Sequence, residues 1–113
     1  MELFGRHVIM KLKANSAAEL TRINESEIIP LLLKQKGFRD ETTFIAPERS
    51  KAITNSFWDT KEDEEAFGRT GYLQVLKALS NVLEETPTVE KFEFAQSTFH
   101  SAVAQRVQER KIY

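Results

Sequence analysis

The sequence predicts an α+β protein, because segments typical of strands and of helices alternate along its 113 residues. Four short segments are rich in β-branched and aromatic residues, as strands are. Two longer segments repeat apolar residues every three or four positions, as amphipathic helices do. Their order is β-α-β-β-α-β, with no linker between them. That order is typical of a ferredoxin-like fold, a four-stranded antiparallel sheet with two helices on one face.

The first strand is expected over residues 3–13. Because successive side chains of a strand point to opposite faces, alternate apolar residues mark one face. These residues are Val8, Met10 and Leu12. The other face would carry His7, Ile9 and Lys11.

The first helix is expected over residues 17–35. Ser16 and Glu19 have the spacing of a capping box at its start, and Gly37 is placed to end it. Pro30 has no N–H for the carbonyl four residues earlier, so we expect a kink there. The apolar side of this helix would comprise Ala17, Leu20, Ile23, Ile28 and Leu31.

Three further strands are expected. Residues 38–46 and 52–58 would form a hairpin joined by residues 47–50. Residues 89–94 would form the last strand, with Phe92 and Phe94 on one face.

The second helix is expected to start at Asp59-Thr60, because acidic residues 62–65 suit the positive end of a helix dipole. Gly68 and Gly71 loosen its middle. It should end at Thr86-Pro87. Its apolar side would comprise Tyr72, Val75, Leu76, Leu79, Val82 and Leu83.

Two helices cover only one face of such a sheet. The other face would expose large apolar side chains, and eight Phe is many for this length. Ile29 and Leu33 also point away from the apolar side of the first helix. An apolar patch of this size usually marks an association surface, so we expect a homodimer whose sheets meet face to face. Residues 1–104 would form the domain, and residues 105–113 a polar tail.

Composition excludes several classes of function. The chain has 16 Lys and Arg against 17 Asp and Glu, a net charge of −1, and a pI near 6.1. Nucleic acid and anionic membranes are therefore not expected as partners. No segment has the length of a membrane span or the pattern of a signal peptide, which predicts a cytoplasmic protein. The absence of Cys excludes disulfides, thiolate metal sites and a Cys nucleophile.

Motifs for common chemistry are also missing. His7 and His100 are the only imidazoles, and neither has the spacing of a metal motif, so we expect no metal site. Gly68-Arg69-Thr70-Gly71 lacks the strand and the Lys of a phosphate loop. No Ser lies in a Gly-x-Ser-x-Gly elbow.

One group of aromatic and polar residues is predicted to line a pocket between sheet and helices, apolar with a few polar anchors. Its members are His7, Asn55, Phe57, Trp58, Phe67, Arg69 and Tyr72. The alternative is that Trp58 and Tyr72 are large core residues with their polar tips satisfied at the rim.

Several segments resemble the antibiotic-biosynthesis monooxygenase domain family, within the dimeric α/β-barrel proteins. The similarity covers about residues 3–100. It is carried by Ile28-Ile29-Pro30-Leu31-Leu32, Lys36-Gly37-Phe38-Arg39-Asp40-Glu41, Ser56-Phe57-Trp58-Asp59, Tyr72-Leu73-Gln74-Val75-Leu76 and Pro87-Thr88-Val89-Glu90-Lys91-Phe92.

The resemblance implies a homodimer with a small cavity in each subunit. Characterised members oxidise polyphenolic substrates with O₂ and need no metal, flavin or haem. An Asn, a Trp and a Tyr are implicated there, and Asn55, Trp58 and Tyr72 are the nearest matches. The haem-degrading branch needs a His and a Trp at positions that fall on Lys77 and Phe67, so haem cleavage is not expected.

Two functional hypotheses follow. In the first, the protein is a cofactor-independent monooxygenase of a small aromatic, quinol-like compound, held by Trp58 and Asn55 with Phe57 and Phe67 alongside. Tyr72 or His7 would accept or relay a proton, and Arg39 or Arg69 would stabilise an enolate or phenolate. In the second, the same dimer and pocket bind a small molecule or serve a stress response without chemistry. A weaker option is a structural dimerisation domain with a filled pocket.

Overall fold

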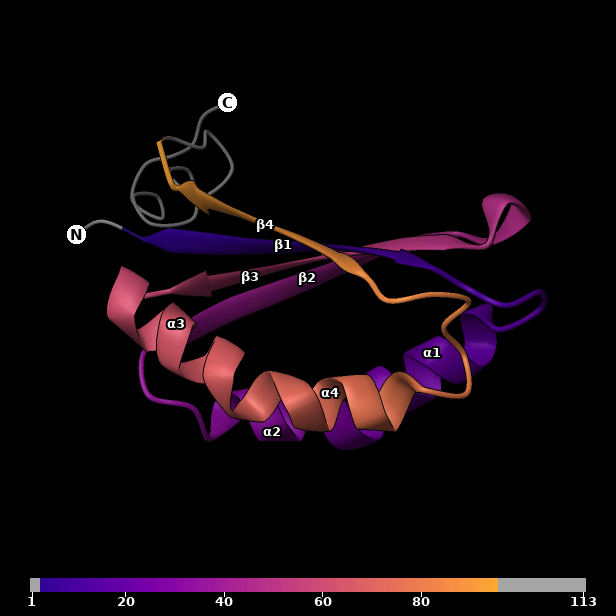
Figure 1. Ribbon diagram of the computed structural model, residues 1–113, viewed down its shortest axis with the longest axis horizontal. Helices are drawn as coiled ribbons and strands as arrows, with labels where there is room; N and C mark the ends of the chain where they lie inside the picture. The colour runs from indigo at the N-terminus through magenta and orange to yellow at the C-terminus, as the bar shows by residue number, and fades with distance from the viewer. Residues whose placement is uncertain (1–2, 96–113) are drawn as a thin grey trace, which may run out of the picture.

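The computed structural model describes residues 3–95, which form a sheet with a layer of helices on one side (Figure 1). The elements are β1 (Phe4–Lys11), α1 (Ala17–Ile23), the π-helical turn η1 (Asn24–Ile28), α2 (Ile29–Leu33), β2 (Phe38–Ala46), the 3₁₀ turn η2 (Pro47–Arg49), β3 (Lys51–Trp58), α3 (Lys61–Arg69), α4 (Gly71–Leu79) and β4 (Thr88–Glu93). The predicted strands agree with the observed ones to within one or two residues. The expected polar tail, residues 105–113, lies outside the described residues.

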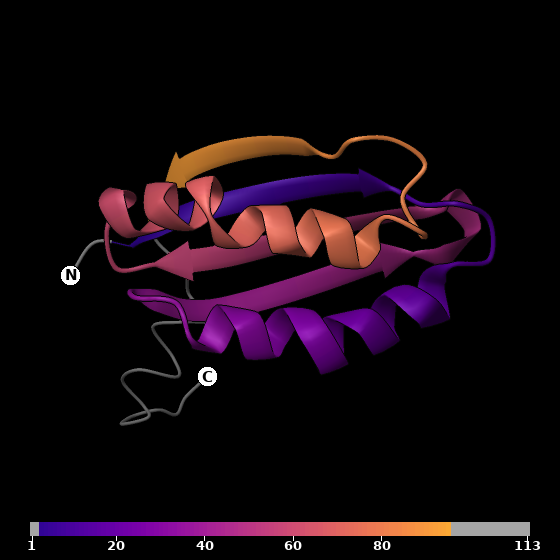
Figure 2. The same ribbon diagram turned by 60° about the horizontal axis from the view of Figure 1, so that its bottom comes forward.

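The sheet has the strand order β2-β3-β1-β4, and all neighbouring strands are antiparallel. In this order β3 and β1 occupy the centre of the sheet, and β2 and β4 form its edges. Figure 2 shows every helix in front of the same face of the sheet. The predicted ferredoxin-like α+β fold is therefore confirmed. Within residues 3–95 no helix is long and apolar enough to cross a membrane.

The two faces of the sheet differ in composition. On the covered face, which the helices pack against, the even-numbered residues of β1 and β3 lie opposite one another, as Val8 lies opposite Thr54. The open face has no helix over it in either view (Figures 1 and 2). It carries Gly5, His7, Ile9, Phe44, Ile53, Asn55, Phe57, Phe92 and Phe94.

The first helix contains a π-helical turn where the sequence predicted a proline kink. The N–H of Ile29 donates to the carbonyl of Asn24, five residues earlier. The turn lies directly before Pro30, which has no N–H to continue an ordinary α-helical ladder. The inserted residue rotates the following turn, and Leu32 is buried where Leu31 was predicted to be. Leu33 does point away, with 69% of its surface exposed.

The starts of the helices agree only in part with those predicted from the sequence. The capping box predicted at Ser16 does not form, because the Ser16 hydroxyl donates to Ala14 and Glu19 binds Arg22 instead. The second helix does start as predicted, since the Thr60 hydroxyl accepts from the N–H of Asp63 at 3.0 Å.

The second helix breaks between α3 and α4 and ends at Leu79, short of the predicted Thr86-Pro87. The break follows Thr70, between the two glycines that were expected to loosen the helix. Val82 is still buried, and Leu83 forms a β-bridge with Leu12. These two residues therefore fill the predicted apolar side without being helical.

The core lies between the covered face and the helices. Trp58, at the end of β3, is fully buried and stacked on Phe67 with 5.0 Å between ring centroids. Phe38 meets the same indole edge-on at 5.5 Å. The other buried core residues are Val8, Met10, Leu12, Leu20, Ile23, Ile28, Leu32, Ala52, Leu79 and Val82. The buried aromatic rings fix the position of α3 on the sheet.

Candidate functional site

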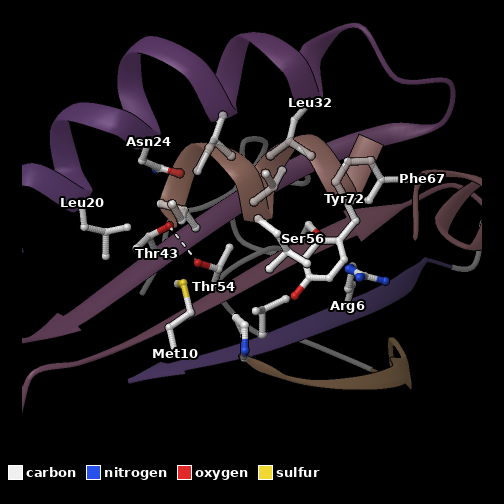
Figure 3. Close-up of a pocket in the computed structure, with 16 residues that line it drawn as sticks. Arg6, Met10, Leu20, Asn24, Leu32, Thr43, Thr54, Ser56, Phe67 and Tyr72 are labelled. Atoms are coloured by element: carbon white, nitrogen blue, oxygen red, sulfur yellow. Dashed lines mark hydrogen bonds between the residues drawn. The ribbon is translucent and has the colours of Figure 1, made fainter. Parts of the chain in front are cut away.

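A cavity lies between the covered face and the helices (Figure 3). Its volume is about 40 Å³, more than the roughly 10–15 Å³ that one water needs but well below an ordinary ligand pocket. The lining comprises Arg6, Val8, Met10, Leu20, Asn24, Ile28, Leu32, Thr43, Thr54, Ser56, Phe67, Tyr72, Val75, Leu76, Leu79 and Pro87. Most of these residues are apolar. A ring-sized ligand therefore fits only if neighbouring side chains rotate.

One end of the cavity contains a buried ion pair. The Arg6 Nη1 atom of β1 donates to Glu64 Oε2 of α3 at 2.5 Å. Only 4% of Arg6 and none of Glu64 is exposed. The second carboxylate oxygen, Glu64 Oε1, lies 3.3 Å from the ammonium of Lys91 on β4. A carboxylate this deeply buried requires such partners, because an unpaired charge is costly away from water.

The glycine at position 68 makes room for this ion pair. A Cβ atom built there would lie 3.1 Å from Arg6 Nη1, closer than nine in ten Cβ contacts. The Arg6 guanidinium therefore fits against the backbone of α3 as well as against Glu64. Its carbon also lies 4.2 Å from the centroid of the Tyr72 ring, a cation–π distance.

Tyr72 of α4 points from the helix layer toward Arg6 (Figure 3). Its hydroxyl is buried and makes no hydrogen bond of ordinary geometry. Burial raises the pKa of the Tyr72 phenol above its ordinary value of 10, and the charge of Arg6 and a hydrogen bond with Arg6 lower it by less. Tyr72 is therefore neutral at physiological pH. It can donate a hydrogen bond, but it is not a ready general base.

The other end of the cavity contains uncharged polar groups on strands β2 and β3. Thr43 donates its hydroxyl hydrogen to Glu41, so the 3.5 Å contact between the Thr43 and Thr54 hydroxyls has Thr54 as donor. Burial raises the pKa of the Glu41 carboxyl, and hydrogen bonds from Thr43 and Asn24 oppose that shift. The π-helical turn places Asn24 at this end.

The structure brings together three of the predicted site residues. Phe67 and Tyr72 line the cavity, and their rings meet edge-on at 6.3 Å. Trp58 lies behind Phe67, and its indole N–H donates to the Ser56 hydroxyl at 3.0 Å. The indole N–H of Trp58 therefore has a hydrogen-bond acceptor, as is usual for a core residue, whereas the Tyr72 hydroxyl makes no such bond.

Three other predicted residues lie on the opposite side of the sheet. His7, Asn55 and Phe57 belong to the open face and do not line this cavity. His7 Nδ1 contacts Asn55 Oδ1 across β1 and β3, and its ring meets Phe92 edge-on. Strand alternation explains the separation, because odd-numbered residues of β3 face away from Trp58.

The two predicted arginines also lie outside the cavity. Arg39 is half exposed at a β-bulge in β2, where it binds Asp59 at 2.8 Å. Arg69 is exposed at the C-terminal end of α3. Neither residue is among those that line the cavity. The cavity has a different arginine, Arg6.

The sequence signal for Arg6 was present but weak. Arg6 has the same parity as Val8 and Met10 in β1, which places it on the buried face. A charged residue on such a face needs a partner, and the α3 acids 62–65 supply one in Glu64. Spacing alone does not say which acid turns inward. Among the described residues, no group of three or more His, Asp or Glu side chains could hold a metal ion.

No protein-family model and no curated protein matches this sequence. Solved structures do share its fold. A protein of unknown function from Nitrosomonas europaea is similar at a TM-score of 0.72 and 19% identity, over 87% of this chain and 94% of that one. A monooxygenase from the gene ActVA-Orf6 of Streptomyces coelicolor, in complex with nanaomycin D, is similar at a TM-score of 0.70 and 14% identity, over 83% and 88%.

SnoaB, a cofactor-independent oxygenase from Streptomyces nogalater, is similar at a TM-score of 0.65 and 16% identity, over 86% of this chain and 96% of that one. At these identities the likeness is one of fold. Within that limit, the resemblance found in the sequence is confirmed: the chain has the fold of the antibiotic biosynthesis monooxygenases.

Proposed function

We propose that the protein is a cofactor-independent monooxygenase of a small phenolic compound, which binds in the cavity between sheet and helices. The observation that carries the proposal is this apolar cavity with Arg6 and Tyr72 at one end, in a fold shared with oxygenases of that kind. An apolar lining suits a planar ring, and the few polar groups would orient it.

The proposed reaction needs only the phenol and O₂. One oxygen atom is added to a ring carbon that bears hydrogen, and the other leaves as water. The product is a quinone, and the four electrons that O₂ accepts all come from the substrate. The protein would bury the ring, hold it near O₂ and favour its electron-rich ionised form.

The roles of the site residues differ from those first predicted. Phe67 and Tyr72 would contact the ring, and Trp58 would position Phe67 from behind. His7 lies on the far side of the sheet, so a proton from the ligand would go to solvent and not to His7. Asn55, Phe57, Arg39 and Arg69 have no proposed contact with this ligand.

Oxygen uptake tests the proposal. Purified protein should consume one O₂ per naphthol or related phenol, without added cofactor, faster than the autoxidation blank. Tyr72→Phe should slow this uptake about tenfold or more, because a donor to the reacting ring is lost. Leu73→Ala, on the exposed side of the same helix, is the matched control. No uptake above the blank with any phenol of a one- and two-ring panel would refute the proposal.

A second function is favoured by one observation: no described residue that lines the cavity is an effective base at neutral pH, since Tyr72 is protonated. The protein would then bind a small aromatic molecule without converting it. Saturable binding of the same phenols without oxygen uptake would support this function over the first.

We further infer that the protein acts as a homodimer joined through the open face. Two large apolar residues there are more than half exposed, Phe44 at 61% and Phe92 at 54%. A hollow of about 200 Å³ lies beside Phe92, over Gly5 and between Phe57, Phe92 and Phe94. A partner sheet would fill this hollow and cover these rings.

A further inference from the structure

Two irregularities of the backbone meet at the uncharged polar end of the cavity. The first is a β-bulge in β2, between Phe38 and Asp40. In an unbroken strand Phe38 and Glu41, three residues apart, would face opposite sides of the sheet. The bulge turns Glu41 to the covered face, where it lies opposite Ser56 of β3. The second irregularity is the π-helical turn η1, which begins at Asn24. Bulges and π-helical turns are frequent at functional sites, where they re-aim side chains.

The Glu41 carboxylate sets the direction of the hydrogen bonds around it, because an ionised carboxylate can only accept them. Thr43 donates its hydroxyl hydrogen to Glu41, and the Asn24 amide also donates to this carboxylate. The single hydrogen of the Thr43 hydroxyl is then in use, so its oxygen accepts from the Thr54 hydroxyl, 3.5 Å away. Hydrogen bonds therefore run in one direction, from Thr54 through Thr43 to Glu41.

This direction decides what the cavity presents to a ligand. Thr54 lines the cavity, whereas Glu41 lies behind Thr43 and does not. Figure 3 shows the Thr43 and Thr54 hydroxyls facing each other at this end, with Asn24 on the helix side. Because the Thr54 hydrogen is used within the chain of hydrogen bonds, its oxygen is left to accept one more. A ligand hydroxyl can donate to this oxygen, whereas a carbonyl would bring a second acceptor and no hydrogen.

We propose that the Thr54 oxygen binds a hydroxyl group of the ligand and discriminates against a carbonyl, and that Glu41 fixes this preference through Thr43. The inference rests on the proposed function, because the same cavity holds the ring. It narrows the substrate class to aromatic compounds that carry a hydroxyl at this end, away from Arg6 and Tyr72. Thr54 contacts the ligand, and Glu41 is a positioning residue because it acts through another side chain.

The preference would separate the substrate from the product. In the proposed reaction the hydroxyl of the phenol becomes a carbonyl of the quinone. The hydrogen bond to Thr54 is then lost, and two acceptor oxygens face each other. A site that pairs with a substrate hydroxyl binds an analogue without that hydrogen more weakly, because its own polar group is left unpaired. The product would therefore leave the cavity more easily than the substrate.

The role of Glu41 makes a prediction that damage to the fold would not imitate. Glutamine at this position keeps the size of the side chain but has an amide that donates hydrogen bonds. If this amide donates to Thr43, the Thr43 hydrogen can turn to Thr54. Thr54 is then free to donate its own hydrogen to a ligand carbonyl. Glu41→Gln should therefore improve the binding of a carbonyl compound, whereas a damaged cavity would bind every ligand less well.

The test compares hydroquinone with 1,4-benzoquinone, two compounds of nearly the same shape that present hydroxyl and carbonyl groups respectively. Equilibrium dialysis under nitrogen measures their binding to the full chain, which has no Cys to react with the quinone. We expect the wild type to bind hydroquinone about tenfold or more tightly than benzoquinone. A ratio of affinities near one, or no binding of either compound, would overturn the proposal.

Two variants assign the preference to its residues. Thr54→Val removes the hydroxyl but nearly keeps the shape, and should lower the ratio about fivefold or more by weakening hydroquinone binding. Glu41→Gln should lower the ratio about fivefold or more by strengthening benzoquinone binding. The matched controls are Thr42→Val, on the open face of β2, and Glu48→Gln, in the exposed turn η2. An unchanged ratio in Thr54→Val or Glu41→Gln, or an equal change in the controls, would overturn the proposal.

The outcome of this test is independent of oxygen uptake. Selective binding of hydroquinone by a protein that consumes no O₂ with phenols would refute the proposed reaction and support this inference. Oxygen uptake by a protein that binds hydroquinone and benzoquinone equally would support the reaction and overturn this inference.

Discussion

Tyr72 and Glu64 have surroundings that are unusual for side chains of their type. One has a buried hydroxyl that makes no hydrogen bond of ordinary geometry, and the other has a carboxylate with none of its surface exposed. Both lie within the network around Arg6. Each leads to a prediction that can be tested without a ligand.

Tyr72 should titrate above its ordinary pKa of 10. The folded protein then holds this proton at pH values where the unfolded chain has lost it. The stabilisation is fully present below pH 10 and is lost as the pH rises through the raised pKa. Ultraviolet titration of wild type minus Tyr72→Phe gives the value directly. A midpoint at or below 10 would contradict the burial of this phenol.

Glu64→Gln should destabilise the protein by about 3–5 kcal/mol, because it leaves the buried Arg6 charge without its carboxylate. Urea unfolding measures the change. The double variant Arg6→Met/Glu64→Leu should lose less stability than Glu64→Gln alone, since no buried charge remains. If the double variant were the less stable of the two, the ion pair would contribute more than its desolvation costs.

At the scale of elements, the break between α3 and α4 depends on a close contact. A Cβ atom at Gly71 would lie 2.7 Å from the Phe67 ring, too close for either to stay in place. Phe67 is packed against Trp58 and cannot easily move. The helix pair therefore needs glycine at position 71 to keep both Phe67 in the core and Tyr72 at the cavity.

Gly71→Ala should cost about 1–3 kcal/mol, the usual range for overpacking. Gly68→Ala is the comparison on the neighbouring turn, because there the new methyl would lie 3.1 Å from Arg6 Nη1, a contact that a shift of a few tenths of an ångström relieves. The added methyl also favours helix at position 68, so that variant should cost less than Gly71→Ala. Equal destabilisation of the two variants in urea would contradict this account.

The π-helical turn is an element that the sequence signalled only indirectly. Ile23 and Ile28 are both buried although they are five residues apart, which is the spacing of a π-helix. If the same residues are placed on a regular α-helix, they form an imperfect apolar side in which Leu31 points inward. Pro30 indicated that the helix would be irregular, because it cannot donate the usual α-helical hydrogen bond. Which hydrogen bond forms nearby instead depends on how the helix packs on the sheet.

At the scale of the whole molecule, the sheet is covered on one face only. Ile9 and Ile53 face one another at the centre of the open face, with Phe44 and Phe92 toward its edges. Phe44 and Phe92 are more than half exposed there, and exposed apolar patches often mark association surfaces. The proposed dimer would bury the open face without altering the cavity on the other side.

Sedimentation should therefore report about twice 13.0 kDa at micromolar concentration. Phe44→Lys should raise the dissociation constant about tenfold or more, because two charges would be buried in the symmetric interface. Leu73→Lys, equally exposed but on α4, should leave the dimer intact. A wild-type monomer, or dissociation by Leu73→Lys alone, would remove the proposed interface.

The sequence by itself determined the order of elements, the strands and the buried face of β1. The alternation of apolar residues in a strand and the turns marked by glycine or proline are local signals. They correctly predict that Val8 and Met10 are buried and that Gly37 lies in a turn. The same alternation separates Asn55 from Trp58, so their assignment to opposite faces was available in the sequence. The resemblance favoured placing them together, and the structure does not.

Only the tertiary structure decided which polar residues meet. Arg6, Glu64 and Lys91 lie on three elements that are far apart in the sequence, and their pairing depends on how α3 crosses the sheet. The position of Tyr72 beside Arg6 depends on where α4 starts, which the close contact of Gly71 with Phe67 restricts. Burial and pairing are properties of packed elements, whereas periodicity is a property of one segment. The element order was therefore readable from the sequence, but the polar end of the cavity was not.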